Sequence, residues 1–237
     1  LFLHKTDLCD KARILLNKGF VKEVVALREV QMELYHLVVN TKLLSENGNV
    51  YKPKSLMAEA DTAKRIAEML MAASKSVDIT NELAEAQQSL KLILSTKQAD
   101  AVKMCFAHNM AIITGGPGTG KTTVLKIVLE VYNKLFKGKI LLTAPTGRAS
   151  RRMSESTGYP DARTLHSALG LVTDEDDDFL NSSDAVDADF VVVDEFSMVD
   201  MRLAAELFRR IQNGTKVLLV GDADQLPSVG AGNVFRE

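Results

Sequence analysis

Four short apolar runs in the second half of the chain constrain its fold more than any other feature. They are rich in Val and Ile, and helix-like segments separate them; they span residues 111–114, 140–143, 190–193 and 217–220. Strands that are apolar along their whole length are typical of parallel sheets with helices on both faces. The sequence therefore predicts an α/β fold of this kind, with ligands bound beyond the carboxyl ends of the strands.

The first 95 residues lack such runs and are typical of a mainly helical region. We expect three parts: a small helical or winged-helix-like region over residues 1–54, a helical linker region over 55–95 and the α/β domain over 96–237. The pair Asn47-Gly48 stands between short apolar stretches and predicts a β-hairpin. A plain helical packing domain is the alternative for the first part, because nothing in it carries chemistry.

A helix with one buried side is predicted over residues 55–74. Apolar residues recur there in alternating steps of four and three, the period of an amphipathic helix; they are Leu56, Ala60, Ala63, Ala67 and Leu70. Ser55 is the expected N-cap, because its side chain can accept a hydrogen bond from the first turn. Met57, Met69 and Met71 fit core filling better than a partner groove.

The composition is that of an ordinary globular protein. There are 29 Lys and Arg against 31 Asp and Glu, so any nucleic-acid contact must come from a local basic patch. No apolar run approaches the length of a membrane span, and we expect no membrane partner. Cys9 and Cys105 have no metal-type spacing and suit a reducing cytoplasm. The chain starts without Met and ends in what reads as the start of a helix, so we expect a fragment of a longer protein.

A glycine-rich segment follows the first predicted strand and precedes an apolar helix. Its pattern, Gly-x4-Gly-Lys-Thr, is that of the phosphate-binding loop of P-loop NTPases. Glycines let backbone N–H groups approach phosphate oxygens, and the helix N-terminus adds its positive end. Lys121 supplies a cation for the β- and γ-phosphates of ATP, and Thr122 places a hydroxyl on Mg²⁺. The predicted nucleotide-binding residues of the loop are Gly115, Gly116, Pro117, Gly118, Thr119, Gly120, Lys121, Thr122 and Thr123.

Two adjacent carboxylates, Asp194 and Glu195, follow the third predicted strand. An ATPase needs an acid that holds the metal ion and a base that polarises the attacking water. We assign Asp194 to Mg²⁺ together with Thr122, and Glu195 to the water. The alternative for Glu195 is a solvated side chain or a cap of the next helix.

Four motifs in the correct order make the second half similar to a known family. They are residues 97–102 around Gln98, residues 144–150, residues 194–199, and residues 221–232 around Gln225. With the phosphate loop, they resemble motifs Q, Ia, II and III of superfamily 1 helicases, in the RecD-like branch related to the alpha subunit of exodeoxyribonuclease V. The resemblance begins near residue 55, and motifs IV to VI are absent. It implies a RecA-like P-loop NTPase fold and an ATP-dependent DNA helicase of recombination or repair.

The resemblance also implies roles for single residues. Gln98 would bind the adenine edge, and Gln225 would sense the γ-phosphate. The catalytic set is then Lys121, Asp194, Glu195 and Gln225. Residues that would grip single-stranded DNA by its phosphates, without reading sequence, are Thr146, Arg148, Ser150, Arg151, Arg152, Thr164 and His166. Ordinary structural roles, as helix caps or as a solvated helix face, are the alternatives.

We therefore expect ATP and Mg²⁺ as cofactors and single-stranded DNA as a partner, with other recombination or repair subunits left open. The chain alone is expected to bind Mg-ATP weakly, to hydrolyse it poorly and to unwind no DNA, because the arginines of a second motor domain are missing. Two other classes stay open. One is a P-loop ATPase or switch that is not coupled to DNA, and the other is a DNA-binding or docking module with a vestigial nucleotide site.

Overall fold

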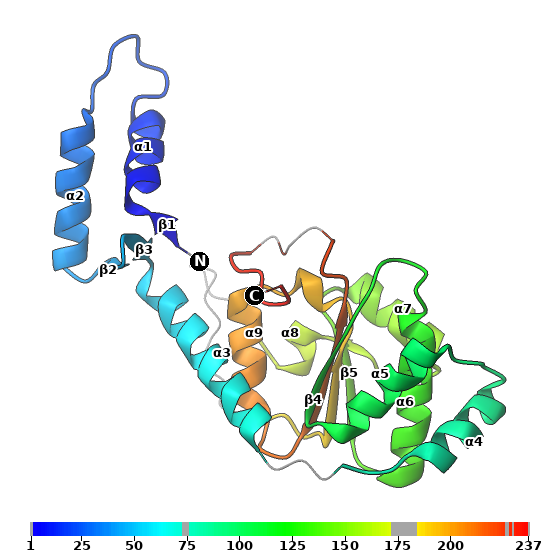
Figure 1. Ribbon diagram of the computed structural model, residues 1–237. Coiled ribbons are helices and arrows are strands. Elements are labelled where there is room, and N and C mark those ends of the chain that lie inside the picture. Colours follow the sequence, from blue (N-terminus) through cyan, green and yellow to red (C-terminus); the bar gives the residue numbers. More distant parts are fainter. Residues whose placement is uncertain (1, 73–75, 172–183, 226–227, 229, 237) are drawn as a thin grey trace. The chain divides into compact units, whose positions relative to one another are not determined.

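The computed structural model describes residues 2–72, 76–171, 184–225, 228 and 230–236 (Figure 1). The chain divides into two units, residues 1–61 and 62–237, and each has its own description below. Of the helices in the described ranges, none combines the length and the hydropathy that a membrane crossing requires.

The first unit is a helical hairpin with a small antiparallel sheet. Its elements are β1 (Leu3–His4), α1 (Lys5–Leu16), α2 (Leu27–Val39), β2 (Leu44–Glu46), β3 (Asn49–Tyr51) and the start of α3 (Pro53–Met71). The strand order is β1-β3-β2. The residues between β2 and β3, Asn47 and Gly48, have φ of 51° and 81°. A two-residue type I′ turn requires positive φ at both positions, so the predicted hairpin is confirmed.

Helix α3 begins two residues before the predicted N-cap. Pro53 takes the first helical position, where its fixed φ suits the helix and its missing N–H costs no hydrogen bond. Ser55 then lies inside the first turn, and its N–H donates to the carbonyl of Lys52 at 3.0 Å. The prediction of Ser55 as the N-cap is therefore wrong.

The buried face of α3 also differs from the predicted one. Four of the five predicted positions are exposed: Ala60, Ala63, Ala67 and Leu70. In the second unit, Thr62 and Met69 are buried instead, and Ile66 packs with Met69 against the apolar residues of α9 (Met201–Arg210). Met57 and Met71 are 63% and 86% exposed, so the prediction of core filling holds for Met69 and is wrong for these two.

Arg65 helps to fix which face of α3 turns inward. Its guanidinium donates to the carbonyls of Phe208 and Ile211, at 3.3 and 2.6 Å, and to the side chain of Asn213 at 2.6 Å. Both carbonyls lie at the end of α9, where the last turn of a helix has no intrahelical donors. A count of apolar periodicity treats Arg as an outward residue, and it therefore misses a cation that caps another helix.

The second unit is built on a five-stranded parallel sheet. Its strands are β4 (Met110–Thr114), β5 (Ile140–Ala144), β6 (Arg163–Thr164), β7 (Phe190–Val193) and β8 (Lys216–Gly221), in the order β4-β8-β7-β5-β6. Every pairing is parallel. The four predicted runs all form strands, and the α/β prediction is confirmed. The edge strand β6 escapes the sequence pattern because two residues make no apolar run.

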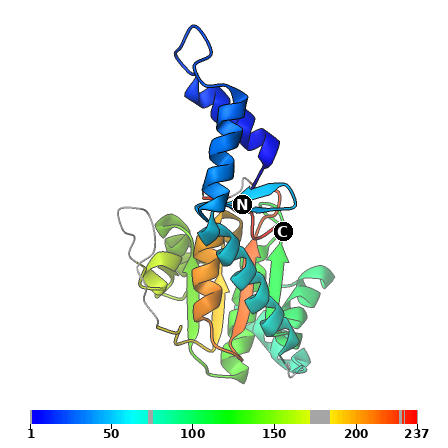
Figure 2. The ribbon, with the colours of Figure 1, turned by 90° about the vertical axis from the view of Figure 1, so that its left-hand side faces the viewer.

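Helices cover both faces of this sheet (Figure 1). They are α4 (Thr80–Leu90), α5 (Thr96–Ala107), α6 (Lys121–Leu135), α7 (Gly147–Thr157), α8 (Leu165–Ala168), the 3-10 helix η1 (Phe196–Met198) and α9. Phe190 and Val192 of β7 join one core with α4 to α7. Val191 and Val193 join the other, with α8, α9 and the end of α3. Figure 2 faces the side that α9 covers. The central strand is therefore held between two apolar cores.

An ion pair with a buried arginine connects α9 to the chain on either side of residues 172–183. Arg210 is 3% exposed, and its guanidinium pairs with Glu206 at 3.0 Å. The same guanidinium donates to the carbonyl of Leu169, and the carbonyl of Arg210 accepts from the N–H of Val186 at 2.9 Å. The pair therefore stabilises α9 together with both flanks of that segment.

Removing the carboxylate of this pair is expected to destabilise the second unit. Because the guanidinium of Arg210 stays buried after its carboxylate partner is lost, Glu206→Ala should lower the free energy of unfolding by about 3 kcal/mol. The matched variant Arg209→Ala removes the more exposed cation on the same carboxylate and should cost at most about 0.5 kcal/mol. Urea denaturation measures both. Equally small effects in the two variants would contradict this expectation.

Candidate functional site

The phosphate loop joins β4 to α6, and two of its glycines have backbone conformations that other residues rarely adopt. Gly118 and Gly120 have φ of 74° and 87°. A Cβ on Gly120 would also collide with the side-chain amide of Gln98. Glycine is therefore required at position 120 both by the backbone and by the close approach of Gln98.

Lys121 begins α6, and its ammonium group lies inside the loop. Its Nζ donates to the carbonyls of Gly115 at 2.5 Å and Gly116 at 3.0 Å. The hydroxyl of Thr119 donates to the carbonyl of Gly116 at 2.9 Å. Of the other predicted loop residues, Pro117, Gly118 and Thr122 are exposed and Thr123 is half-buried. A cation is thus held at a helix N-terminus, where backbone N–H groups favour an anion.

Gln98 caps α5 and also touches the phosphate loop. It forms a capping box with Ser95: its Oε1 accepts from the N–H of Ser95 at 3.0 Å, and its own N–H donates to Ser95 Oγ at 3.4 Å. Its Nε2 donates to the carbonyl of Thr119 at 3.1 Å. Gln98 therefore has the structural role of a helix cap, which is the alternative to adenine binding. The same side chain also contacts the phosphate loop.

The carboxylate pair comes directly after β7. The N–H of Asp194 donates to the carbonyl of Thr143 on β5, and the N–H of Glu195 donates to Asp194 Oδ1, both at 2.9 Å. Glu195 has a φ of 53°, in the left-handed region that is strained for residues other than glycine. Strain of this kind persists only where the surroundings fix it, and it is concentrated at functional sites.

Both carboxyl groups have a raised pKa. Burial raises the pKa of Asp194, although the backbone N–H of Glu195 lowers it. Burial and then the charge of Asp194 raise the pKa of Glu195, and a third carboxylate, Asp222, raises it further. Lys121 and Arg152 oppose both shifts. The charges of the phosphate loop and of the carboxylate pair therefore act within one site.

Two charged residues have a part in this site that the sequence does not predict. Asp222 is 4% exposed directly after β8, and no role is predicted for it. The available signal is a carboxylate directly after a buried strand, as for Asp194. Arg152 is exposed on α7, where it is predicted to contact DNA, and its charge also lowers the pKa of Asp194 and of Glu195. This second effect depends on how α7 packs, which its sequence does not encode locally.

Gln225 is exposed in the turn after β8. Its backbone N–H donates to the carbonyl of Asp222 at 3.2 Å. The N–H of Gly115 in the phosphate loop donates to the carbonyl of Gly221 at 3.3 Å. The turn that carries Gln225 and the phosphate loop are therefore neighbours, while the Gln225 side chain lies at the surface.

The helices α7 and α8 begin side by side beyond β5 and β6. Thr146 caps α7 by accepting from the N–H of Ala149 at 3.2 Å, and Thr164 caps α8 by accepting from the N–H of Ser167 at 3.1 Å. A methyl carbon of Thr164 lies 4.0 Å from the place a Cβ would take on Gly147. The two predicted DNA-contacting threonines are therefore brought together, each with a structural role of its own.

The other predicted DNA-contacting residues differ in exposure. Arg148, Arg151 and His166 are exposed. Ser150 is 5% exposed, and its hydroxyl donates to the carbonyl of Gly147 at 3.1 Å. Ser150 therefore does not reach the surface that the arginines share.

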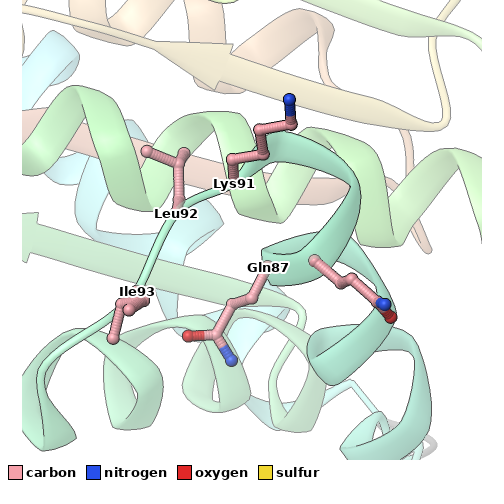
Figure 3. Close-up of a pocket in the computed structure, with 5 residues that line it drawn as sticks. Gln87, Lys91, Leu92 and Ile93 are labelled. Carbon is pink, nitrogen blue, oxygen red and sulfur yellow. The ribbon is translucent and has the colours of Figure 1, made fainter.

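Figure 3 shows a cavity of about 480 Å³ outside this site. It lies where α4 ends and is lined by Gln87, Gln88, Lys91, Leu92 and Ile93. The Oε1 of Gln87 accepts from the N–H of Leu94 at 2.9 Å, so it holds the following loop. None of the predicted site residues lines this cavity.

The residues at the starts of α6 and η1 suit Mg²⁺. This ion prefers one or two protein oxygens and completes its shell with water and phosphate oxygens. The hydroxyl of Thr122 and the carboxylate of Asp194 are donors of this kind. Within the described ranges no group of three or more His, Cys, Asp or Glu is gathered as a metal site. An ion here would therefore be held largely by the nucleotide.

The raised pKa of Asp194 gives a pH-dependent prediction. A protonated carboxyl does not attract Mg²⁺, so the affinity for Mg-nucleotide should fall as the pH is lowered through this raised pKa. A carboxyl whose pKa is higher in the folded state also stabilises the fold at low pH, and this contribution is lost as the pH rises through the folded-state pKa. Asp194→Asn should remove the part of both dependences that comes from this carboxyl, while the part from Glu195 remains.

Calorimetric titration with Mg-ADP and urea denaturation, from about pH 4 to about pH 8, measure the two quantities. The control is nucleotide without Mg²⁺, whose affinity should not fall as the pH is lowered, because an ionised Asp194 repels the phosphates. A wild-type affinity for Mg-ADP that is constant over this range would contradict the prediction.

Comparisons with known proteins show the family of the chain. The model of the AAA domain family matches residues 98–231, more than half of the chain. The ATP-dependent RecD2 DNA helicase of Deinococcus radiodurans is 36% identical over 185 residues, which are 78% of this chain and 25% of that protein. The RecD subunit of the RecBCD enzyme of Haemophilus influenzae is 39% identical over 162 residues, 59% of this chain and 25% of that protein. The chain thus spans about a quarter of the length of these relatives.

A solved structure supports the fold. The UvsW helicase from bacteriophage T4 superposes with a TM-score of 0.50 at 12% identity, over 76% of this chain and 73% of that one. This likeness concerns the fold alone, and it fits the predicted RecA-like P-loop architecture. The chain therefore belongs to the AAA domain family, and its similarity to RecD2 and RecD confirms the RecD-like resemblance of its motifs.

Proposed function

We propose that this chain is the ATP-binding part of an ATP-dependent helicase or translocase that acts on single-stranded DNA in recombination or repair. The observation that carries the proposal is the shared site of Lys121, Asp194 and Glu195 at the carboxyl edge of the sheet. The names of the relatives, a DNA helicase and a subunit of the RecBCD enzyme, support this activity and suggest similar subunits as partners.

In the proposed site, Lys121 binds the β- and γ-phosphates of ATP, and Thr122 and Asp194 hold the Mg²⁺ of the nucleotide. When bound, the ion neutralises charge that develops on the phosphates during transfer. Glu195 accepts the proton of the attacking water. Burial raises the pKa of Glu195, and a base whose pKa is closer to the working pH is a better proton acceptor.

Gln98 and Gln225 complete the nucleotide site in this proposal. The amide of Gln98 already donates to the carbonyl of Thr119, so it lies where the nucleotide would enter the loop. Gln225 senses the γ-phosphate from a turn whose base is bonded to the phosphate loop, through Gly221 and Gly115.

We assign the DNA contact to the surface where α7 and α8 begin. Exposed cations there neutralise DNA phosphates without reading sequence. The contacting residues are Thr146, Arg148, Arg151, Thr164 and His166. Ser150 supports the first turn of α7 from inside, through its bond to Gly147. We also place the protein in the cytoplasm, where buried thiols such as Cys9 and Cys105 stay reduced.

The test is Mg-ATP turnover by the chain with and without a single-stranded oligonucleotide. Stimulation by DNA that Lys121→Ala abolishes would support the proposal. Arg148→Ala combined with Arg151→Ala should weaken binding of single-stranded DNA and lower its salt slope by about 0.7 for each DNA phosphate that is no longer neutralised. The matched control is Arg209→Ala on α9.

Two results would favour the other classes. Turnover that DNA leaves unchanged would indicate a P-loop ATPase or switch. Oligonucleotide binding without any nucleotide binding would indicate a DNA-binding module with a vestigial nucleotide site.

A further inference from the structure

A buried hydroxyl beside the carboxylate pair has no hydrogen-bond partner among the described residues. It belongs to Ser197, in the middle of η1 and two residues after Glu195. Ser197 is 4% exposed. An unpaired buried hydroxyl costs free energy, and in a native protein it calls for a reason in function or in a second state.

Ser197 lies against the end of β8. Its backbone N is 3.1 Å from the place that a Cβ would take on Gly221, and a ring carbon of Phe235 is 2.9 Å from the same place. Glycine is therefore needed here because η1 and β8 approach each other so closely. Asp222 is the next residue along the chain from this contact.

Asp222 is a buried carboxylate with few partners. Within the described part of the chain its side chain accepts one hydrogen bond, from the N–H of Asp224 to Oδ1 at 3.1 Å. An ionised carboxylate has room for about four. A buried hydroxyl without a partner and a buried carboxylate with spare acceptor sites thus lie on either side of the contact at Gly221.

Gly230 and Ala231, farther along the chain, also contact the segment that follows Glu195. Asp200 caps α9 by accepting from the N–H of Leu203 at 2.9 Å, and a Cβ on Gly230 would collide with the Asp200 side chain. The N–H of Met201 donates to the carbonyl of Ala231 at 3.1 Å. The segment from η1 to α9 therefore contacts the chain on both sides of Gln225.

We propose that Ser197 is a positioning residue whose hydroxyl donates to the Asp222 carboxylate when a nucleotide with a γ-phosphate is bound. This hydrogen bond joins η1 to the turn that carries Gln225. It makes the position of Glu195 and that of Gln225 depend on each other. The inference rests on the nucleotide site proposed above. It names the hydrogen bond that connects the part of the site with Glu195 to the part with Gln225.

The unpaired state of the hydroxyl gives the proposal a distinctive signature. In the nucleotide-free chain Ser197→Ala breaks no hydrogen bond, so the urea midpoint of unfolding should stay the same or rise. In the presence of a γ-phosphate analogue, the variant lacks the hydrogen bond to the Asp222 carboxylate and should bind the analogue more weakly. A structural serine would show the reverse, a loss of stability and no change in nucleotide preference.

The experiment compares the affinities of the full chain for Mg-ADP and for Mg-ADP with aluminium fluoride, which mimics the transferring phosphoryl group. We expect Ser197→Ala to lose about 10-fold in affinity for the aluminium fluoride complex and to keep its affinity for Mg-ADP. Asp222→Ala, which removes the acceptor oxygens, should show a similar loss, and the double variant should lose no more than the larger single loss, because both changes remove the same interaction.

Thr62→Val is the matched control. Thr62 also has a buried hydroxyl without a partner in the described ranges, at 3% exposure, but it lies on α3. The Thr62→Val variant should keep its affinity for Mg-ADP and for the aluminium fluoride complex.

The outcomes separate this inference from the proposed function. If the wild-type chain prefers the aluminium fluoride complex and Ser197→Ala keeps that preference, the hydrogen bond to Asp222 is refuted and the ATP site stands. Additive losses in the double variant would refute it as well. A wild-type chain that binds neither complex would overturn the proposed function and this inference with it.

Discussion

Lys121→Ala is expected to weaken Mg-nucleotide binding about 10- to 100-fold and to leave the fold intact. The ammonium group donates to the carbonyls of Gly115 and Gly116, and bound phosphates would take over these donors. A hydrogen bond between charged groups is worth about 1.5–3 kcal/mol, which sets the size of the loss. Lys121 is half-buried at the surface of the loop, so its removal opens no core cavity.

Calorimetric titration with Mg-ADP measures this loss, and urea denaturation checks the fold. Lys134→Ala is the matched control, because Lys134 lies in the last turn of the same helix and pairs with Glu85 at 2.9 Å. Equal losses in both variants would mean that α6, rather than the cation in the loop, controls binding.

Glu195→Gln is expected to lower ATP turnover about 100- to 10,000-fold without weakening nucleotide binding. An amide cannot accept the proton of the attacking water, and general base catalysis is worth about this factor. The affinity should hold or rise, because the variant removes a carboxylate whose pKa is raised first by burial and then by the charge of the adjacent Asp194. Single-turnover hydrolysis with the protein in excess over ATP is the measurement.

Glu155→Gln, at an exposed position on α7, is the control for a neutralised carboxylate elsewhere. Turnover that survives in Glu195→Gln would assign the base to another group, and Asp222 would be the first candidate. A parallel loss of nucleotide affinity would instead assign Glu195 to binding.

The sheet and its phosphate loop could be predicted because their signals are local. Four of the five strands are continuous apolar runs, and the loop requires glycine where its backbone φ is positive, as at Gly120 with a φ of 87°. The carboxyl ends of parallel strands meet at one edge, so Asp194 and Lys121 are brought together by topology alone. The two groups lie close enough that the charge of Lys121 lowers the pKa of Asp194.

The errors arise where a distant element decides the environment of a residue. Arg65 turns one face of α3 toward α9, and the exposed alanines Ala60 and Ala63 therefore lie outside the buried face that periodicity predicts. Ser150 is drawn inward by its own helix turn. The left-handed backbone of Glu195 has no sequence signal, since it depends on a fixed strand before it and on η1 after it.

The position of β7 in the centre of the sheet has a consequence for motion. All four of its residues are buried to 2% exposure or less, and the strand is hydrogen-bonded to β5 on one side and β8 on the other. Amide hydrogens in such a strand exchange with solvent only through the largest unfolding events, whereas those of an exposed loop exchange through small local fluctuations. Deuterium should therefore enter the loop around Pro117 and Gly118 long before it enters Val191 and Val192. Asp194 and Glu195 therefore follow the strand that we expect to exchange most slowly. Of the two parts of the site, we expect the phosphate loop to change its conformation when a nucleotide binds.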